Sequence, residues 1–86
     1  MIEGKTKSGF VFAIDPEVQD DMELLDAIAE ADENPLKITN VLKRLLGEEQ
    51  KKVLYEHVRD EKGHVSIKAV SQEIVDIFNS SQQGKN

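Results

Sequence analysis

Residues 34–47 decide the fold of this chain, and they read NPLKITNVLKRLLG. Asn34 is a good N-cap, and Pro35 suits the first helical position because its missing N–H would have no partner there. Gly47 ends the pattern, since glycine readily takes the positive φ that reverses the chain after a last helical turn. The apolar residues between these signals follow the i, i+3, i+4, i+7, i+8 spacing of a buried helix face: Ile38, Val41, Leu42, Leu45 and Leu46.

Another helix is predicted on the N-terminal side of Asn34. It starts at Asp15-Pro16, an N-cap acceptor followed by a proline, or at Asp20, where Glu23 completes a capping-box spacing. From either start the apolar residues fall on one side at helical spacing: Val18, Met22, Leu24, Leu25, Ile28 and Ala29.

Two more helices are predicted on the C-terminal side of Gly47. The first runs from Glu48 to about Asp60, and the second is capped by Ser66. One side of the first contains Val53, Leu54, His57 and Val58. The second has an apolar face of Ile67, Val70, Ile74, Ile77 and Phe78, and an outward face of Lys68, Gln72, Glu73 and Asp76.

Residues 2–14 predict a small β-hairpin before the helices. Phe10, Phe12 and Ile14 alternate along its second strand, and Ser8-Gly9 breaks the stretch in the middle. A lone hairpin is only marginally stable, so its aromatic face must lie on helices or on a partner.

Length and composition limit the fold class further. A chain of 86 residues fits one small domain, and 38% hydrophobic with 33% charged residues suits neither a disordered tail nor a membrane span. We therefore expect a mainly α single domain over residues 1–79, with the hairpin packed on a bundle of about four helices. Residues 80–86 contain no apolar anchor, and we expect them to form a flexible, mobile tail.

The sequence contains few of the residue patterns that catalysis, phosphate binding or metal binding requires. There is no cysteine, and an EF-hand loop from Asp15 fails because its sixth residue is Asp20 and its twelfth is Asp26. The two histidines lie on a helix end and in a loop, and the isolated glycines form no phosphate-binding loop. We expect no catalytic, cofactor-binding or metal-binding residues. The start of the chain lacks the apolar stretch of a secretory signal, and we expect a cytoplasmic protein.

Charge is distributed unevenly along the chain. Residues 15–33 contain nine acidic residues and no Lys or Arg, whereas the remainder carries +3, which gives −6 in total. The acidic stretch is either the solvated face of a soluble bundle or a surface complementary to a basic partner or to another copy. The last two helices superficially resemble a helix-turn-helix, but the acidic outward face predicted for the last one argues against nucleic-acid binding.

The order of elements is similar to that of the small tail assembly chaperones of long-tailed, siphovirus-type phages and prophages of Gram-positive bacteria. The similarity rests on five segments: KSGF at 7–10, DDMELLDAIAEAD at 20–32, NP at 34–35, LLGE at 45–48 and AVSQEI at 69–74. It covers nearly the whole chain, although it contains no catalytic signature.

This resemblance implies a non-enzymatic protein of the bacterial host cytoplasm. Such a protein coats the long, helical tape measure protein and keeps it soluble during tail morphogenesis, and self-association is common in such families. The alternatives are a small acidic adaptor or regulator that binds another protein and, less favoured, a helix-turn-helix DNA-binding module.

Apolar residues away from the main helical stripes are the candidates for a protein-binding groove. On the hairpin they are Phe10 and Phe12, and on the helices they are Leu36, Tyr55 and Val75. An amphipathic helix of a partner would anchor in such a groove through residues at i, i+3 and i+4. The competing interpretation makes the two phenylalanines ordinary core residues and the other three scattered surface residues.

Overall fold

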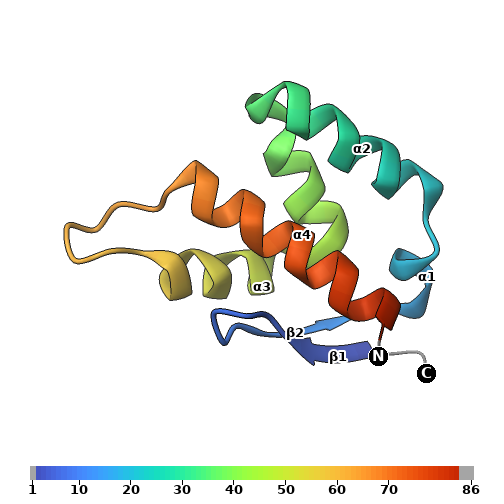
Figure 1. The fold of residues 1–86 in the computed structure, drawn as a ribbon, viewed down its shortest axis with the longest axis horizontal. Coiled ribbons are helices and arrows are strands. Elements are labelled where there is room, and N and C mark those ends of the chain that lie inside the picture. The colour runs from blue at the N-terminus through green and yellow to red at the C-terminus, as the bar shows by residue number, and fades with distance from the viewer. Residues whose placement is uncertain (1, 84–86) are drawn as a thin grey trace.

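The computed structural model describes residues 2–83 of the chain, and side chains up to residue 81. It is mainly helical and begins with a two-stranded antiparallel hairpin, as predicted (Figure 1). The elements are β1 (Ile2–Lys5), β2 (Val11–Ile14), α1 (Pro16–Gln19), α2 (Met22–Glu33), the 3-10 helix η1 (Pro35–Lys37), α3 (Ile38–Val58) and α4 (Ile67–Gln83).

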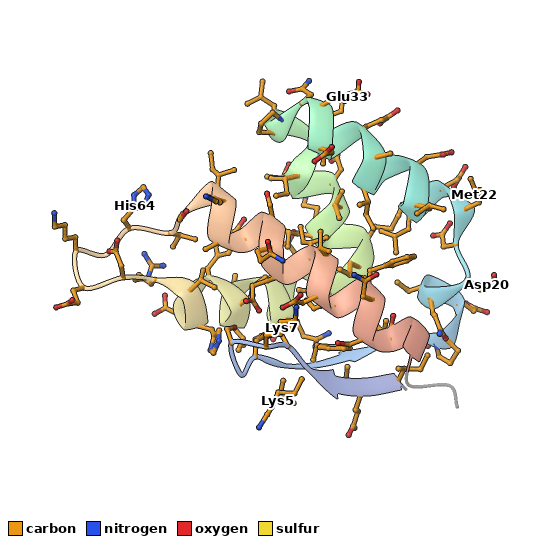
Figure 2. The ribbon with its side chains drawn as sticks, viewed as in Figure 1. Lys5, Lys7, Asp20, Met22, Glu33 and His64 are labelled. Atoms are coloured by element: carbon orange, nitrogen blue, oxygen red, sulfur yellow. The ribbon has the colours of Figure 1, made fainter. Side chains whose placement is uncertain are left out.

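The hairpin pairs Gly4 with Phe12 and Ile2 with Ile14. Side chains alternate along β2, so that Phe12 and Ile14 are buried while Val11 is exposed. The Phe12 ring covers Gly4 so closely that a Cβ built on Gly4 would lie 2.6 Å from its Cζ atom. The aromatic side of the hairpin therefore packs on the helices, and the Lys5 side chain points away from them (Figure 2).

The predicted helix start at Asp15-Pro16 and the alternative start near Asp20 both exist, because the first helix is split in two. Pro16 opens the single turn of α1, and α2 begins after Asp21, whose carboxylate accepts a hydrogen bond of 3.0 Å from the Glu23 amide. The N-cap of α2 is thus Asp21, one residue later than the capping-box spacing predicts.

The long helix α3 is broken at Gly47, where φ is 80° and ψ is 170°. This positive φ confirms the predicted end of the helix over residues 34–47, and the second segment, residues 48–58, follows directly. The two segments diverge in direction, so that α3 contacts α2 through its first part and lies along the hairpin with its second part (Figure 1). Ser66 caps α4, since its Oγ accepts a hydrogen bond of 3.2 Å from the Ala69 amide.

The core lies between the hairpin and the helices, with β1 against α4 and β2 against α3. Gln50 on α3 joins the backbone of β2 from the side, because its amide group both accepts from Ala13 N at 2.8 Å and donates to Ala13 O at 2.6 Å. The buried hydrophobic residues are Phe10, Phe12, Ile14, Leu24, Val41, Leu42, Leu45, Leu46, Leu54, Val70, Ile74 and Ile77.

Several details differ from the sequence predictions. Glu73 and Asp76 are buried, because the hairpin turn covers the side of α4 predicted to face solvent. Val53 is exposed although it was assigned to the apolar side of its helix. The helix α4 extends to Gln83, so residues 80–83 of the predicted flexible tail are helical. The rest of that predicted tail, residues 84–86, lies outside the described residues.

Candidate protein-docking groove

An apolar groove of about 320 Å³ lies between η1, α3 and the start of α4. Its floor contains Leu42 and Val70, which also belong to the hydrophobic core. Its rim contains Leu36 and Ile67, which are 86% and 61% exposed, and Tyr55 forms a further part of the wall. Apolar side chains gathered around a concavity are typical of binding surfaces, whereas single exposed ones are not.

The rim residue Leu36 is held outward by the turn that precedes α3. The Asn34 side chain accepts a hydrogen bond of 3.2 Å from the Leu36 amide, and the Asn34 carbonyl accepts one of 2.9 Å from Lys37 N. Pro35 fixes φ at the first position of this turn. The sequence NPLK therefore forms a rigid 3-10 turn that presents Leu36 to solvent.

The opposite rim is positioned by the loop between α3 and α4. The Asp60 carboxylate accepts hydrogen bonds of 2.9 Å from both Lys62 N and His64 N. These contacts, the bond from His64 foremost, hold the pKa of Asp60 below its ordinary value of 3.8. Arg59 donates to Gly63 O at 2.9 Å and closes the loop from the other side. The start of α4, with Ile67 at its first position, is thereby fixed relative to α3.

Tyr55 lies on the second segment of α3, next to a basic side chain. The Nζ atom of Lys51 is 6.0 Å from the centre of the Tyr55 ring and 3.1 Å from Oε1 of Glu48. The hydrogen bond from Lys51 is the main reason why the pKa of Glu48 lies below its ordinary value of 4.5. An ion pair of Lys51 and Glu48 therefore lies next to the aromatic wall of the groove.

The structure brings together two of the five predicted binding residues. Leu36 and Tyr55 line the same groove, although 19 positions separate them in the chain. Val75 is exposed but lines a second groove of much smaller volume, about 60 Å³, whose wall includes Ile28 and Ile74. Ile38 borders both grooves, so Val75 lies near the candidate site rather than within it.

The proposal that Phe10 and Phe12 offer a surface contact is corrected by the structure. Their exposed fractions are 2% and 1%, because the hairpin folds its aromatic face onto the helices. Phe12 packs over Gly4, and the Phe10 ring lies 5.8 Å from the His57 ring, centre to centre. Both phenylalanines are core residues.

Sequence reasoning missed the part that Ile67 has in the groove. Helical periodicity placed it on the buried face of its helix, yet it is largely exposed at the rim. Its position directly after the capping Ser66 was the available signal, because it places Ile67 at the very end of the helix.

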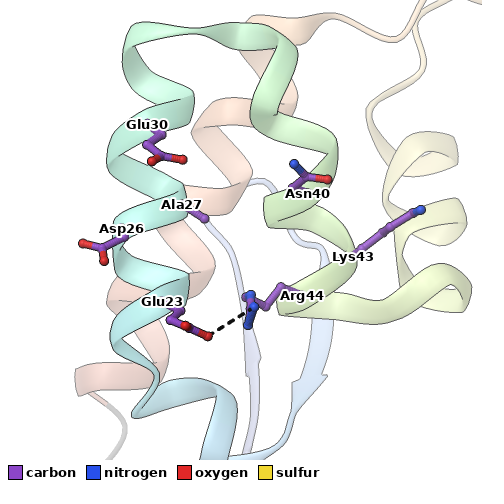
Figure 3. Close-up of a pocket in the computed structure, with 7 residues that line it drawn as sticks. All are labelled: Glu23, Asp26, Ala27, Glu30, Asn40, Lys43 and Arg44. Atoms are coloured by element: carbon purple, nitrogen blue, oxygen red, sulfur yellow. Dashed lines mark ion pairs between the residues drawn. The ribbon is translucent and has the colours of Figure 1, made fainter.

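A third concavity, of about 640 Å³, lies between α2 and α3 and is polar. Figure 3 shows its two sides: acidic residues on α2 and basic residues on α3. Arg44 reaches across to Glu23 at 3.5 Å and to Asp21 at 3.4 Å. These ion pairs are partly exposed, so they orient α2 on α3 more than they stabilise the fold.

Within residues 2–83, no cluster of three or more His, Asp or Glu side chains is arranged to hold a metal ion. In the same range, every helix is too short or too polar to cross a membrane. The chain was also compared with protein-family models, with curated proteins and with solved structures, and none of the three comparisons gave a match.

Proposed function

We propose that this chain is a non-enzymatic tail assembly chaperone, which binds the tape measure protein of a long-tailed phage and keeps it soluble in the bacterial cytoplasm. The observation that carries the proposal is the exposure of Leu36 and Ile67 on two sides of an apolar groove. The similarity of the chain to that family supplies the identity of the client.

The groove suits an amphipathic helix as ligand. Such a helix would insert apolar side chains spaced at i, i+3 and i+4 between Leu36, Tyr55 and Ile67. Each side chain that becomes fully buried contributes about 1.5–3 kcal/mol, so two or three anchors are enough for a reversible complex once the cost of association is subtracted. Reversible binding is what a chaperone needs if tube subunits are to displace it.

The proposal is tested by co-expressing the chain with helical fragments of a tape measure protein. The unmodified chain should keep the fragments in the soluble fraction and should be retained with them on an affinity column. Leu36→Glu should abolish both effects, because it places a charge at the rim of the groove without disturbing a buried residue.

Val53→Glu is the matched control, since Val53 is an exposed apolar residue of α3 outside the groove. Equal solubility of the fragments with Leu36→Glu and with the unmodified chain would contradict the proposal. Equally tight retention of unrelated amphipathic helices would favour the general adaptor instead, and salt-sensitive binding to duplex DNA would favour the third alternative.

A further inference from the structure

A further concavity, of about 400 Å³, lies where α1 and α2 meet the last part of α4. Its apolar surface comes from Met22 and Leu25, in the first turn of α2, and from Phe78 on α4. Met22 is 66% exposed and Leu25 is 42% exposed, so both present apolar surface to solvent. We call this concavity the acidic cleft, because its other lining residues are Gln19, Asp20 and Asp21.

Hydrogen bonds hold the two walls of the acidic cleft in place. Nε2 of Gln19 donates to the Ser81 carbonyl at 2.8 Å and so joins α1 to the end of α4. The Ser81 hydroxyl donates to the Phe78 carbonyl at 2.8 Å. On the other wall, the Asp21 carboxylate accepts from the Glu23 amide at 3.0 Å and caps α2. The apolar side chains therefore lie on a preformed surface, which lowers the entropy cost of binding.

The acidic cleft is negatively charged. Within the described part of the chain, Asp20 forms no ion pair, and the single ion pair partner of Asp21 is Arg44, at 3.4 Å. None of the described residues that line the cleft is basic. Asp26, directly after Leu25, is exposed as well, and residues 15–33 contain nine acidic residues without a Lys or Arg. Such a surface attracts cationic ligands and repels nucleic acid.

We propose that the acidic cleft binds a basic amphipathic helix of another protein. Met22 and Leu25 are three positions apart on α2 and form a short ridge, against which apolar side chains of the incoming helix pack together with Phe78. Lys or Arg side chains beside them approach Asp20 and Asp26. The apolar contact supplies most of the affinity, and the charges supply specificity for a basic partner.

This surface is separate from the groove of the proposed function. The two share no lining residue. Met22 and Asp20 lie at one end of the molecule, and His64, in the loop before the α4 rim of the groove, lies at the other (Figure 2). The contact therefore goes beyond the proposed function and holds whichever client the groove has.

The probe for the test is a fluorescently labelled synthetic helix of Leu and Lys, with Leu at i, i+3, i+4 and i+7. The matched probe has Glu at every Lys position. By fluorescence anisotropy, the unmodified chain should bind the Lys peptide with an affinity that falls as salt rises, and should not bind the Glu peptide. No binding of the Lys peptide, or equal binding of both peptides, would overturn the proposal.

A pair of double variants tests the apolar contact. Met22→Ser with Leu25→Ser should weaken binding of the Lys peptide about tenfold or more, because the exposed parts of the two side chains amount to about one whole apolar side chain. Val11→Ser with Val53→Ser removes two similarly exposed apolar side chains outside the cleft and should leave binding unchanged. Equal weakening by the two double variants would sink the proposal.

A second pair of variants tests the charges. Asp20→Lys and Glu33→Lys change the net charge equally, but Glu33 ends α2 outside the cleft. Asp20→Lys should weaken binding about fivefold, since it replaces an attraction by a repulsion, and Glu33→Lys should weaken it clearly less. Equal losses would mean that the peptide responds to net charge alone, which contradicts a cleft-specific contact.

A second copy of the chain is the competing occupant. Concentration-dependent sedimentation of the unmodified chain alone, abolished by Met22→Ser with Leu25→Ser, would assign the cleft to a second copy and overturn the proposal. The client assay keeps this inference apart from the proposed function. Leu36→Glu should lose tape measure fragments and still bind the Lys peptide, whereas Met22→Ser with Leu25→Ser should do the reverse. Fragments held without peptide binding would refute this inference alone, and peptide binding without fragments would refute the proposed function alone.

Discussion

Ser8 and Glu73 are 65 positions apart in the chain, and the Ser8 hydroxyl donates a hydrogen bond of 2.7 Å to Oε2 of Glu73. With its proton directed at Glu73, the hydroxyl accepts from Nε2 of His57 at 3.0 Å. Beside it, the Lys7 amide donates to Asp76 at 3.4 Å. The hairpin turn is thus connected by hydrogen bonds to both α4 and the second segment of α3.

Ser8→Ala should lower the free energy of unfolding by about 1–3 kcal/mol, the cost of leaving a buried polar group without its partner. Glu73 is only 5% exposed, and its Oε1 atom already has no hydrogen-bond partner within the described part of the chain. Urea denaturation followed by circular dichroism measures the change. The control is Ser71→Ala on α4, which removes a half-buried hydroxyl outside this network and should change stability little; an equal loss in both variants would contradict the prediction.

Gly4→Ala should destabilise the hairpin by about 1–3 kcal/mol, because the added methyl group forces the Phe12 ring out of its place. In a Phe12→Leu background, Gly4→Ala should lower the free energy of unfolding by clearly less, since the smaller side chain leaves room for the methyl group. The double-mutant cycle therefore yields a coupling energy between the two positions. Additive effects would show that the close packing of Phe12 on Gly4 is not what requires glycine.

The Asp60 loop should loosen in acid. Because folding lowers the pKa of Asp60, its ionised form contributes stability above the ordinary value of 3.8, and that contribution disappears as the pH falls through the lowered, folded-state pKa. An NMR titration should place the midpoint of the Asp60 carboxyl below 3.8 and show the Lys62 and His64 amides shifting with it. In Asp60→Asn these acid-dependent shifts should be absent; a midpoint at or above 3.8 in the unmodified chain would refute the prediction.

The main elements could be predicted from local sequence alone. The stretch 34–47 contains its own start signal, apolar face and stop signal, and the structure confirms all three in η1, the first segment of α3 and Gly47. The alternation of Phe12 and Ile14 likewise fixed the buried face of β2. These features depend on neighbours within a few residues, which a pattern of residue types records directly.

Most of the errors arise where distant segments meet. Glu73 and Asp76 have the spacing of an outward helix face, and only the arrival of the hairpin turn buries them. Phe10 and Phe12 were named as binding candidates because the alternation shows which face of the hairpin is apolar but not whether helices of this chain or a partner cover it. Leu36 and Tyr55 could be named as off-stripe residues, but their meeting in one groove depends on the path of the chain around Gly47 and Asp60.

The break at Gly47 divides α3 into two segments, and each segment contributes residues to the groove. Leu42 belongs to the segment before the break and Tyr55 to the segment after it. A Cβ built on Gly47 would have no other atom within 4 Å, so the positive φ alone requires glycine there. Because both segments pack into the same hydrophobic core, the backbone angle at Gly47 sets how far apart Leu42 and Tyr55 lie. An L residue at position 47 would have to leave the φ of 80°, and the two sides of the groove would then shift relative to each other.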